Sequence, residues 1–510
     1  MHRTPRPALT LAVTAVIALA AALPVQGVGQ SKNLRDKSDP DATSERNVLR
    51  DASMVLMLAV QGDVGPACEA MDAVLKDPGV GALARPKHAE VLLLASFVYS
   101  QCNRLDDAVK QAQASAALER TPNAVMMIAS WSEQAGKNDE SAEALVAFAR
   151  EWPKDTALHA MQTVWSNFRA WSDAPAKQRA FLQALFDARF NPKDADASEL
   201  WFELARLHLD AGDVAAAKRV AAEVKGLTSA AKMRVDRRFD PVLADAPQLG
   251  DYKAQAARLL ESLRAKQAAA PRAMPLRTAI AEEMVLLGDY AGALEFVDGT
   301  LADVRGAKED EWEARYHATF MLRARASANL RQGKMQPAIE DLEMASMFVA
   351  PGSVDFPRLM LAEQLCDMGR PKDAEAAADI EVEEPRFLAN VRQVLRVCAA
   401  TGLGDAARAR KLTDALRATV GPGERELLLT AYLYLGDVDA AARLYIDMLD
   451  NPAERNEMLL WAQKDRRLEP MPGIAGYRRT FDAMVARPDV QAALQKYGRV
   501  LEWDIYLGLE

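Results

Sequence analysis

The sequence predicts an all-α protein built as a solenoid of helix-turn-helix units. Apolar residues recur at helical spacing along most of the 510 residues, and turn signals interrupt them again and again. The composition agrees, because 50% of the residues are hydrophobic but only 6% are aromatic, so alanine, leucine and valine must fill closely packed helix interfaces. A repeat stack grows in one dimension, which lets a chain of this length fold without one large core.

The clearest unit runs from Trp201 to Val224. Apolar and aromatic side chains recur at i, i+3, i+4 and i+7 from Trp201 to His208. Gly212 ends this first helix, and the same spacing returns from Ala217 to Val224. Two short helices with single apolar stripes cannot form a core alone, so the unit requires similar neighbours on either side.

The same frame, a turn residue followed five positions later by a small residue, recurs along the chain. The turn residue must be small or tolerate positive φ, and the small residue lies where the two helices approach most closely. A single frame is weak evidence, but nine frames at helical spacing are strong. They are Gly62/Ala67, Asn103/Ala108, Gly136/Ser141, Gly212/Ala217, Gly288/Ala293, Gly333/Ala338, Gly369/Ala374, Gly436/Ala441 and one whose turn is Gly402 or Gly404.

The unit resembles a tetratricopeptide repeat. Trp201, Leu204 and Ala217 match the pattern of that family. Three positions depart from it: Ala205 replaces a glycine, His208 a tyrosine and Ala221 a phenylalanine. The resemblance implies a right-handed superhelical solenoid whose first helices line a concave face, and we expect the chain to form it in two halves. In such arrays an extended peptide or a partner helix lies on that face.

Carried over by position from the resemblance, six residues are expected to point into the concave face and to bind a partner. Arginine and aromatic residues are enriched in interface hot spots, although ordinary surface is an equally good interpretation of these positions. The six are Phe202, Arg206, Arg323, Arg331, Asp367 and Tyr434.

The chain is expected to have five parts. Residues 1–27 are typical of a secretory signal peptide, with basic residues before an apolar run, and residues 28–44 of a flexible polar leader. Residues 45–250 and 251–464 form an N-terminal and a C-terminal repeat array, and residues 465–510 form a cap and tail. We therefore expect an exported, periplasmic protein with no membrane span after cleavage. An uncleaved anchor in the inner membrane is the alternative.

The boundary at residue 250 rests on a duplicated motif. Residues 236–241, Asp-Arg-Arg-Phe-Asp-Pro, return in type as residues 465–470, and each copy precedes a short loop and a tyrosine. We interpret both as terminal caps of a stack, because the end of a solenoid must present a polar surface. A charged binding site is the alternative.

The four cysteines form two pairs at the spacing of one repeat, Cys68 with Cys102 and Cys366 with Cys398. An exported protein meets an oxidising compartment, so two disulfides are expected. Free cysteine is also a common buried hydrophobe, and this alternative stays open.

No catalytic, cofactor or metal signature is found in the sequence. The five histidines are far apart without a second ligand at zinc spacing, and no phosphate-binding or nucleophile motif occurs. The net charge of −9 argues against nucleic acid as a partner. We expect a non-enzymatic scaffold of the cell envelope that binds another protein or peptide, in an oligomeric state that the sequence leaves open. The alternatives are a component of a polysaccharide or outer-membrane export machine, and a hydrolase or glycan-acting enzyme within a helical solenoid.

Overall fold

The computed structural model describes residues 40–152, 158–192, 195–306, 317–347, 356–379, 386–464 and 472–505. Within these residues the regular elements are helices, and the only extended pairings are two isolated bridges, Asp236 with Gly498 and Lys464 with Glu502. The expected all-α class is confirmed. The expected signal peptide lies outside the described residues, as does the second copy of the duplicated motif, residues 465–470. Residues 40–44, which were expected to belong to a flexible leader, are helical, because the first described helix begins at Pro40.

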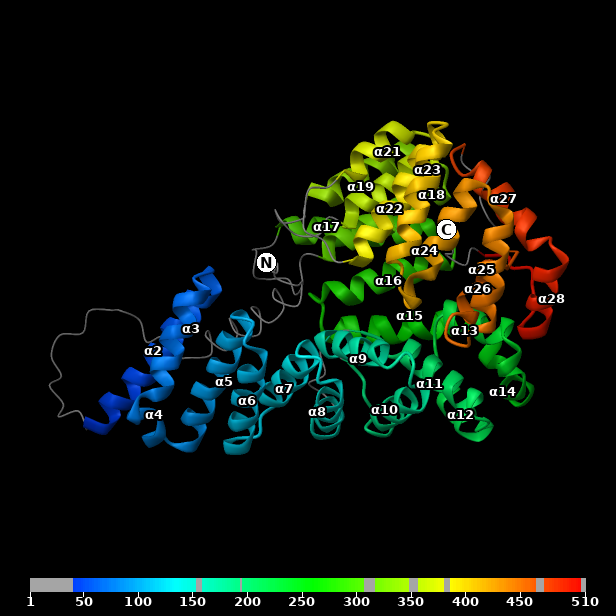
Figure 1. The fold of residues 1–510 in the computed structure, drawn as a ribbon. Helices are drawn as coiled ribbons and strands as arrows, with labels where there is room; N and C mark the ends of the chain where they lie inside the picture. Colours follow the sequence, from blue (N-terminus) through cyan, green and yellow to red (C-terminus); the bar gives the residue numbers. More distant parts are fainter. Residues whose placement is uncertain are drawn as a thin grey trace. The chain divides into compact units, whose positions relative to one another are not determined.

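The chain divides into two compact units, unit 1 up to Ala197 and unit 2 from Ser198. The expected boundary at residue 250 is therefore wrong, since residues 198–250 pack with unit 2. Unit 1 is a run of antiparallel helical hairpins (Figure 1). Its helices are α2 (Pro40–Gln61), α3 (Val64–Lys76), α4 (Pro78–Ala82), α5 (Arg85–Gln101), α6 (Leu105–Leu118), α7 (Pro122–Gln134), α8 (Asn138–Glu151), α9 (Leu158–Ala170) and α10 (Pro175–Asp187).

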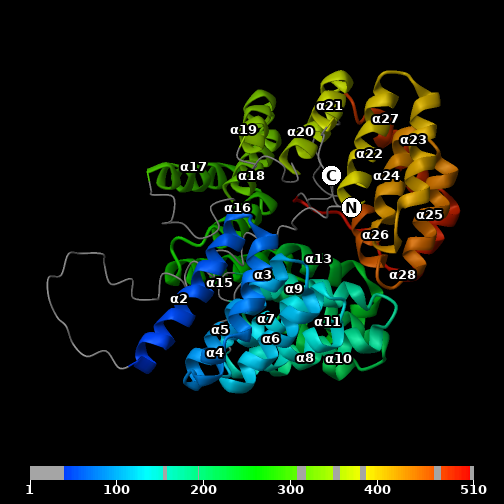
Figure 2. The same ribbon diagram turned by 60° about the vertical axis from the view of Figure 1, so that its left-hand side comes forward.

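Unit 2 continues the hairpin pattern, and consecutive helices lie side by side along it (Figure 2). Among the described residues of unit 2, the short 3₁₀ turns η1 (Arg237–Phe239), η2 (Pro247–Gly250) and η5 (Pro422–Glu424) join some of its helices. The helices are α11 (Ser198–Asp210), α12 (Val214–Ala221), α13 (Leu227–Val235), α14 (Asp240–Asp245), α15 (Tyr252–Ala269), α16 (Met274–Leu286), α17 (Tyr290–Gly306), α18 (Ala318–Arg331), α19 (Met335–Met347), α20 (Phe356–Asp367), α21 (Pro371–Ala378), α22 (Arg386–Gly402), α23 (Ala406–Thr419), α24 (Arg425–Leu435), α25 (Val438–Asp450), α26 (Arg455–Trp461), α27 (Ala475–Val485) and α28 (Pro488–Tyr497).

The turn residues of the repeat frame all adopt the left-handed conformation that the sequence predicted. Their φ angles run from 58° at Asn103 to 97° at Gly62, and Gly404, not Gly402, is the turn of the ambiguous frame. The small residue five positions later is at most 1% exposed in every frame, as at Ser141 and Ala338. Because a larger side chain at either position would strain the turn or separate the helices, the frame specifies each hairpin.

An aspartate follows several of the turn glycines and begins the second helix of the hairpin. The side chains of Asp213, Asp405 and Asp437 each accept a hydrogen bond from the backbone N–H three residues later, at 2.9 to 3.0 Å. Such N-caps satisfy a helix donor that would otherwise lack a partner. The Gly-Asp pair therefore ends one helix and starts the next.

Unit 2 closes on itself, because helices near its two ends meet. Helix α13 lies beside α26, and residues 498–505 extend along both (Figures 1 and 2). The backbone N–H of Arg499 donates to the carbonyl of Val235 at 3.0 Å, and that of Trp503 donates to the carbonyl of Lys464 at 2.8 Å. The motif at residues 236–241 is thus not the cap of an open stack, as expected, but part of the contact that closes unit 2.

The cysteines are paired as the repeat spacing suggested. Cys68 joins Cys102 within unit 1, and Cys366 joins Cys398 within unit 2. The Cα atoms lie 6.5 and 6.4 Å apart, within the range that a disulfide spans. Each bond links neighbouring repeats.

Candidate functional site

The six expected partner-binding residues lie in three different places, all within unit 2. Phe202 and Arg206 belong to a buried polar junction on α11. Arg323, Asp367 and Tyr434 lie on the first helices of three hairpins, α18, α20 and α24, and the charges of Arg323 and Glu363 and of Glu363 and Tyr434 act on one another. Arg331 is half-buried at the end of α18 and is engaged by other groups of the protein. None of these placements tests binding itself.

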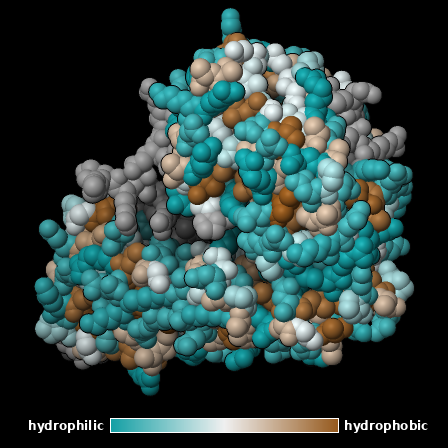
Figure 3. Space-filling view, turned by 45° about the vertical axis from the view of Figure 1, so that its right-hand side comes forward, coloured by the Kyte–Doolittle hydropathy of each residue, from teal (hydrophilic) through white to brown (hydrophobic). Residues whose placement is uncertain are grey.

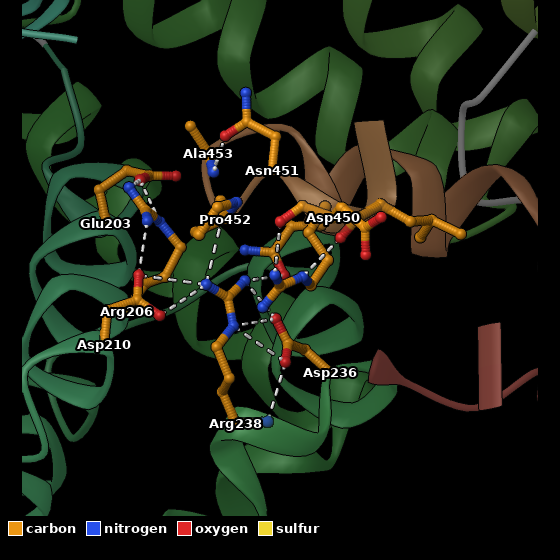
Figure 4. Close-up of polar contacts among 12 residues, drawn as sticks. Glu203, Arg206, Asp210, Asp236, Arg238, Asp450, Asn451, Pro452 and Ala453 are labelled. Carbon is orange, nitrogen blue, oxygen red and sulfur yellow. Dashed lines mark hydrogen bonds and ion pairs between the residues drawn. The ribbon is translucent and has the colours of Figure 1, made fainter. Parts of the chain in front are cut away.

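The junction is a set of buried ion pairs (Figure 4). Arg206 pairs with Glu203 at 2.7 Å and with Asp210 at 2.9 Å, and its side chain is only 5% exposed. Arg238 pairs with Asp236 at 2.5 Å and with Asp210 at 2.9 Å. Burial alone would lower the pKa of Arg238, but the hydrogen bonds and charges of Asp236 and Asp210 outweigh it and raise the pKa. Each charged side chain of the junction therefore has a partner of opposite charge.

Phe202 is fully buried beside this junction. Its ring stacks on Phe239 with centroids 5.4 Å apart, and the ammonium of Lys232 lies 5.7 Å above it. Phe202 and Arg206 are therefore buried and do not point into an open concave face as expected, and their contact with a partner stays a prediction. The segment after α12 packs over this face of α11, so both side chains serve the interior of unit 2.

The junction also connects the two ends of unit 2. Arg238 donates to the carbonyl of Pro452 and to the side chain of Asn456, both at 3.3 Å. Lys232 pairs with Glu457 at 2.5 Å. These contacts bridge more than 200 residues of sequence, so the junction holds unit 2 closed.

The second group of residues is the better candidate for binding. We call it the Glu363 cluster, and it comprises Glu282 of α16, Arg323 of α18, Glu363 and Asp367 of α20, Tyr434 of α24 and Tyr477 of α27. The rings of Tyr434 and Tyr477 lie 5.0 Å apart at an angle of 49°. Each of these elements is the first helix of a hairpin except α27, so the cluster crosses several repeats.

The electrostatics of the Glu363 cluster are dominated by burial and by negative charge. Burial raises the pKa of Glu363, and the nearby positive charge of Arg323 opposes the shift. Burial also raises the pKa of Tyr434 well above its ordinary value, and the charges of Asp367 and Glu363 add to the effect. Both side chains are only half-buried by exposed area. They are thus enclosed by protein and still accessible to solvent.

Within the cluster, Arg323 contacts Glu282 and the ring of Phe320. Its guanidinium donates to Glu282 and lies 5.6 Å from the centre of the Phe320 ring. Asp367 is 9% exposed, and its backbone carbonyl accepts a hydrogen bond from Gly473 at 2.8 Å. Glu363, in contrast, has no hydrogen-bond or ion-pair partner among the residues that the structure describes.

Glu282, Glu363 and Tyr477 were not among the residues expected from the sequence to bind a partner. A signal for the two glutamates was present, because each stands six residues before the turn glycine of its repeat, at Gly288 and Gly369. Arg206 occupies that same position before Gly212. Glu363 also precedes Asp367 by one helical turn, which places both carboxylates on one face of α20. Tyr477 lies on α27, which no repeat frame covers.

The described residues give little support for a metal site or a membrane span. They contain no group of three histidine, cysteine or acidic side chains that could hold a metal ion, and none of their helices is long and apolar enough to cross a membrane. A cavity of about 490 Å³ lies between α26, α27, α28 and the tail, lined by Lys464, Arg478, Phe481 and Asp482 among others. On the face drawn in Figure 3, hydrophobic residues are scattered among hydrophilic ones.

Comparisons with known proteins find weak similarity to solved structures. No protein-family profile matches the chain, and no curated protein sequence matches it. Among solved structures it is similar to a tetratricopeptide repeat protein from Parabacteroides merdae, at 11% identity over 63% of this chain and 98% of that one, with a TM-score of 0.30. It is also similar to yeast Tom70, at 11% identity over 89% of this chain and 100% of that one, with a TM-score of 0.34. Likenesses this weak carry no argument on function.

Proposed function

We propose that this chain is a scaffold that binds a segment of another protein at the Glu363 cluster of unit 2. The observation that carries the proposal is Glu363 itself, a carboxylate enclosed by protein, reachable by solvent and without a protein partner among the described residues. A buried charge without a partner destabilises the fold that contains it, and such groups are found where a ligand completes the site. The cluster also contains Tyr434 and Tyr477, and tyrosine is enriched in the hot spots of protein interfaces.

The proposal is tested by blocking the cluster. Glu363→Arg reverses the charge and fills the space beside Tyr434, whereas Glu340→Arg makes the same change at an exposed position of α19. Wild type and both variants are used to capture partners from an extract of the cell envelope. We expect partners that are retained by wild type and Glu340→Arg and lost by Glu363→Arg. Identical partner sets for all three proteins would refute the assignment of binding to this cluster.

We further propose that the protein is exported to the periplasm, where the scaffold acts. The support is the basic start and apolar run of residues 1–23, together with cysteine pairs that suit an oxidising compartment. After expression of the full chain in a bacterium, the protein is expected in the periplasmic fraction with the mass that loss of residues 1–27 predicts. An intact N-terminus in the membrane fraction would favour the uncleaved anchor instead.

A further inference from the structure

Residues 499–505, which we call the extended segment, follow α28 and are bound to unit 2 through their main chain. The backbone N–H of Lys464 donates to the carbonyl of Leu501 at 3.1 Å, and the backbone N–H of Trp503 donates to the carbonyl of Lys464 at 2.8 Å. Peptides that add a strand to a sheet edge are held in the same way, and such main-chain bonds supply affinity for any extended chain. The extended segment is therefore bound as a peptide ligand would be.

The side chains of the extended segment alternate between unit 2 and solvent. Trp503 and Ile505 are only 5% and 8% exposed, and Leu501 packs against the same core, whereas Glu502 and Asp504 are exposed. Residues two apart lie on the same side of an extended chain. The segment thus presents one apolar side to unit 2, and pockets for alternate side chains are what give specificity to extended-peptide sites.

Gln463 is placed to recognise this segment. Its side-chain carbonyl oxygen accepts from the backbone N–H of Leu501 at 2.8 Å and from the indole N–H of Trp503 at 3.1 Å. The amide is 2% exposed, and its nitrogen donates to the carbonyl of Leu459 at 2.6 Å, which fixes the orientation of the acceptor. A buried acceptor therefore binds both the main chain of the segment and the polar group of its tryptophan.

The start of α15 recognises the next part of the segment. The ring of Tyr252 lies 4.9 Å from that of Trp503, in an edge-to-face arrangement that aromatic pairs favour. The ammonium of Lys253 pairs with the carboxylate of Asp504 at 2.6 Å, and the hydroxyl of Tyr252 donates to the same carboxylate. A tryptophan followed directly by an acid is thus recognised by two consecutive residues.

The extended segment can leave this surface more easily than the surface itself can unfold. The segment forms no helix, whereas the surface belongs to α13, α15 and α26 and to the residues just after α26. These helices also contact one another, since α13 lies beside both α15 and α26. Segments with few contacts open locally at a lower free energy than packed helices do. The surface is therefore preserved when the segment is displaced.

We propose that this surface is a binding site for an extended segment of another protein, and that residues 499–505 occupy it from within the chain. The partner segment carries an aliphatic residue, a tryptophan two positions later and an acid directly after the tryptophan, the groups that Gln463, Tyr252 and Lys253 contact. It displaces the chain's own segment and makes the same bonds. The site is separate from the Glu363 cluster and does not depend on it.

A second copy of this chain is the less favourable occupant. Gly498 packs so closely that an added Cβ would lie 2.4 Å from Leu459 and 2.6 Å from the carbonyl oxygen of Val235. The extended segment is therefore held at its start against its own molecule, and it would have to reach a second molecule from that point.

A peptide of residues 498–505, labelled with fluorescein, tests the proposal by fluorescence anisotropy against the full chain and three variants. Trp503→Ala removes the main anchor of the chain's own segment, and Asp504→Lys repels Lys253. Asp504→Lys alters an exposed side chain, so it tests the proposal even if Trp503→Ala fails to fold. Glu502→Lys is the matched control, because the exposed Glu502 contacts Lys464 only at 3.9 Å.

We expect the peptide to bind Trp503→Ala at least tenfold, and Asp504→Lys at least threefold, more tightly than it binds wild type or Glu502→Lys. The reason is that the chain's own segment competes at a high effective concentration in the last two proteins. Replacing the tryptophan of the peptide by alanine is expected to weaken its binding to both opened variants at least tenfold.

Three results would overturn the proposal. The first is no binding of the peptide to either opened variant, and the second is equal binding to all four proteins. The third is binding that does not depend on the tryptophan of the peptide. Sedimentation of the wild type completes the test: dimers that the unlabelled peptide converts to monomers would make a second copy the occupant and overturn the assignment to another protein.

Discussion

Arg238 contacts both ends of unit 2, pairing with Asp236 and Asp210 and donating to Pro452 and Asn456. Its side chain is 14% exposed, and it pairs with Asp236, whose side chain is fully buried. Removing one partner of a buried pair leaves the other charged and unsatisfied, which typically costs about 3 to 5 kcal/mol. We expect Arg238→Ala to lower the free energy of unfolding of unit 2 by that amount, measured by urea denaturation.

Arg370→Ala is the matched control for this measurement. Arg370 also pairs with an aspartate, Asp373, but the two side chains are 47% and 53% exposed. Exposed pairs contribute about 0 to 1 kcal/mol, because water screens them. Equal losses in the two variants would contradict the structural role given to the junction.

Glu363 is expected to make the folded protein less stable as pH rises. Burial raises its pKa in the folded state above the ordinary value that it has in the unfolded chain. Between these two pKa values the folded state binds more protons, so its stability falls as pH increases through that window. We expect Glu363→Gln to be more stable than wild type at pH 7, with a difference that shrinks toward pH 4. Urea denaturation at both pH values measures it.

Glu340→Gln is the control for the measurements at different pH, and one outcome would contradict the expectation for Glu363. Glu340→Gln, at an exposed position, is expected to differ from wild type by the same small amount at every pH. A Glu363→Gln protein that is less stable than wild type at pH 7 would show that the carboxylate has a stabilising partner in the protein.

The sequence predicted the contacts that these residues make within one hairpin. It did not predict their contacts with distant segments of the chain. Positive φ at Gly212 and burial of Ala217 follow from the geometry of one hairpin, so spacing alone was sufficient. The role of Arg206 depends on Arg238, which binds the same Asp210 from another segment. A repeat pattern assigns a residue to a helix face, but it does not say which later segment covers that face.

At the scale of elements, Gly473 permits the close approach of the chain before α27 to the end of α20. An added Cβ would lie 1.8 Å from the carbonyl oxygen of Cys366 and 2.7 Å from the nitrogen of Gly369. Backbone atoms cannot move aside as a flexible side chain can. We expect Gly473→Ala to reduce the free energy of unfolding by about 3 kcal/mol, the upper end for overpacking.

Two other glycines provide the comparison. Gly436 has φ of 75° but only one atom within 4 Å of an added Cβ, so Gly436→Ala is expected to cost about 1 to 2 kcal/mol through strain alone. Gly423 has neither positive φ nor a close neighbour, and Gly423→Ala should be nearly neutral. Denaturation curves that rank the three substitutions otherwise would contradict the close packing at Gly473.

The two cysteine pairs link neighbouring helices in each unit and close loops of similar length, with sequence separations of 34 and 32. Under the loop-entropy account, each bridge contributes roughly 3 to 4 kcal/mol. We expect no free thiol when the protein is purified and denatured without reductant and then reacted with a thiol reagent. Four free thiols would refute both bridges, and two would leave one bridge to be located by peptide mass.

At the scale of the whole molecule, the repeat architecture was predictable and the closure of unit 2 was not. Each hairpin is specified within about forty residues, so nine frames were enough to predict a solenoid. Closure depends on contacts such as that of Arg237 with the carbonyl of Gly498, 261 residues away. The pattern of residues 236–241 indicated the end of a stack, and the segment does lie at an end. The partner that covers it is the other end of the same unit.

Trp503 closes unit 2, so its removal is expected to loosen helices far apart in sequence. The ring is 5% exposed, lies 4.9 Å from that of Tyr252 and donates to Gln463 at 3.1 Å. We expect Trp503→Ala to cost about 3 to 5 kcal/mol. Because the tail contacts both ends, amide hydrogen exchange should accelerate in α13 and in α26 together, while α7 of unit 1 stays as in wild type. Acceleration confined to α26 and the tail would show that the closing contacts do not stabilise α13.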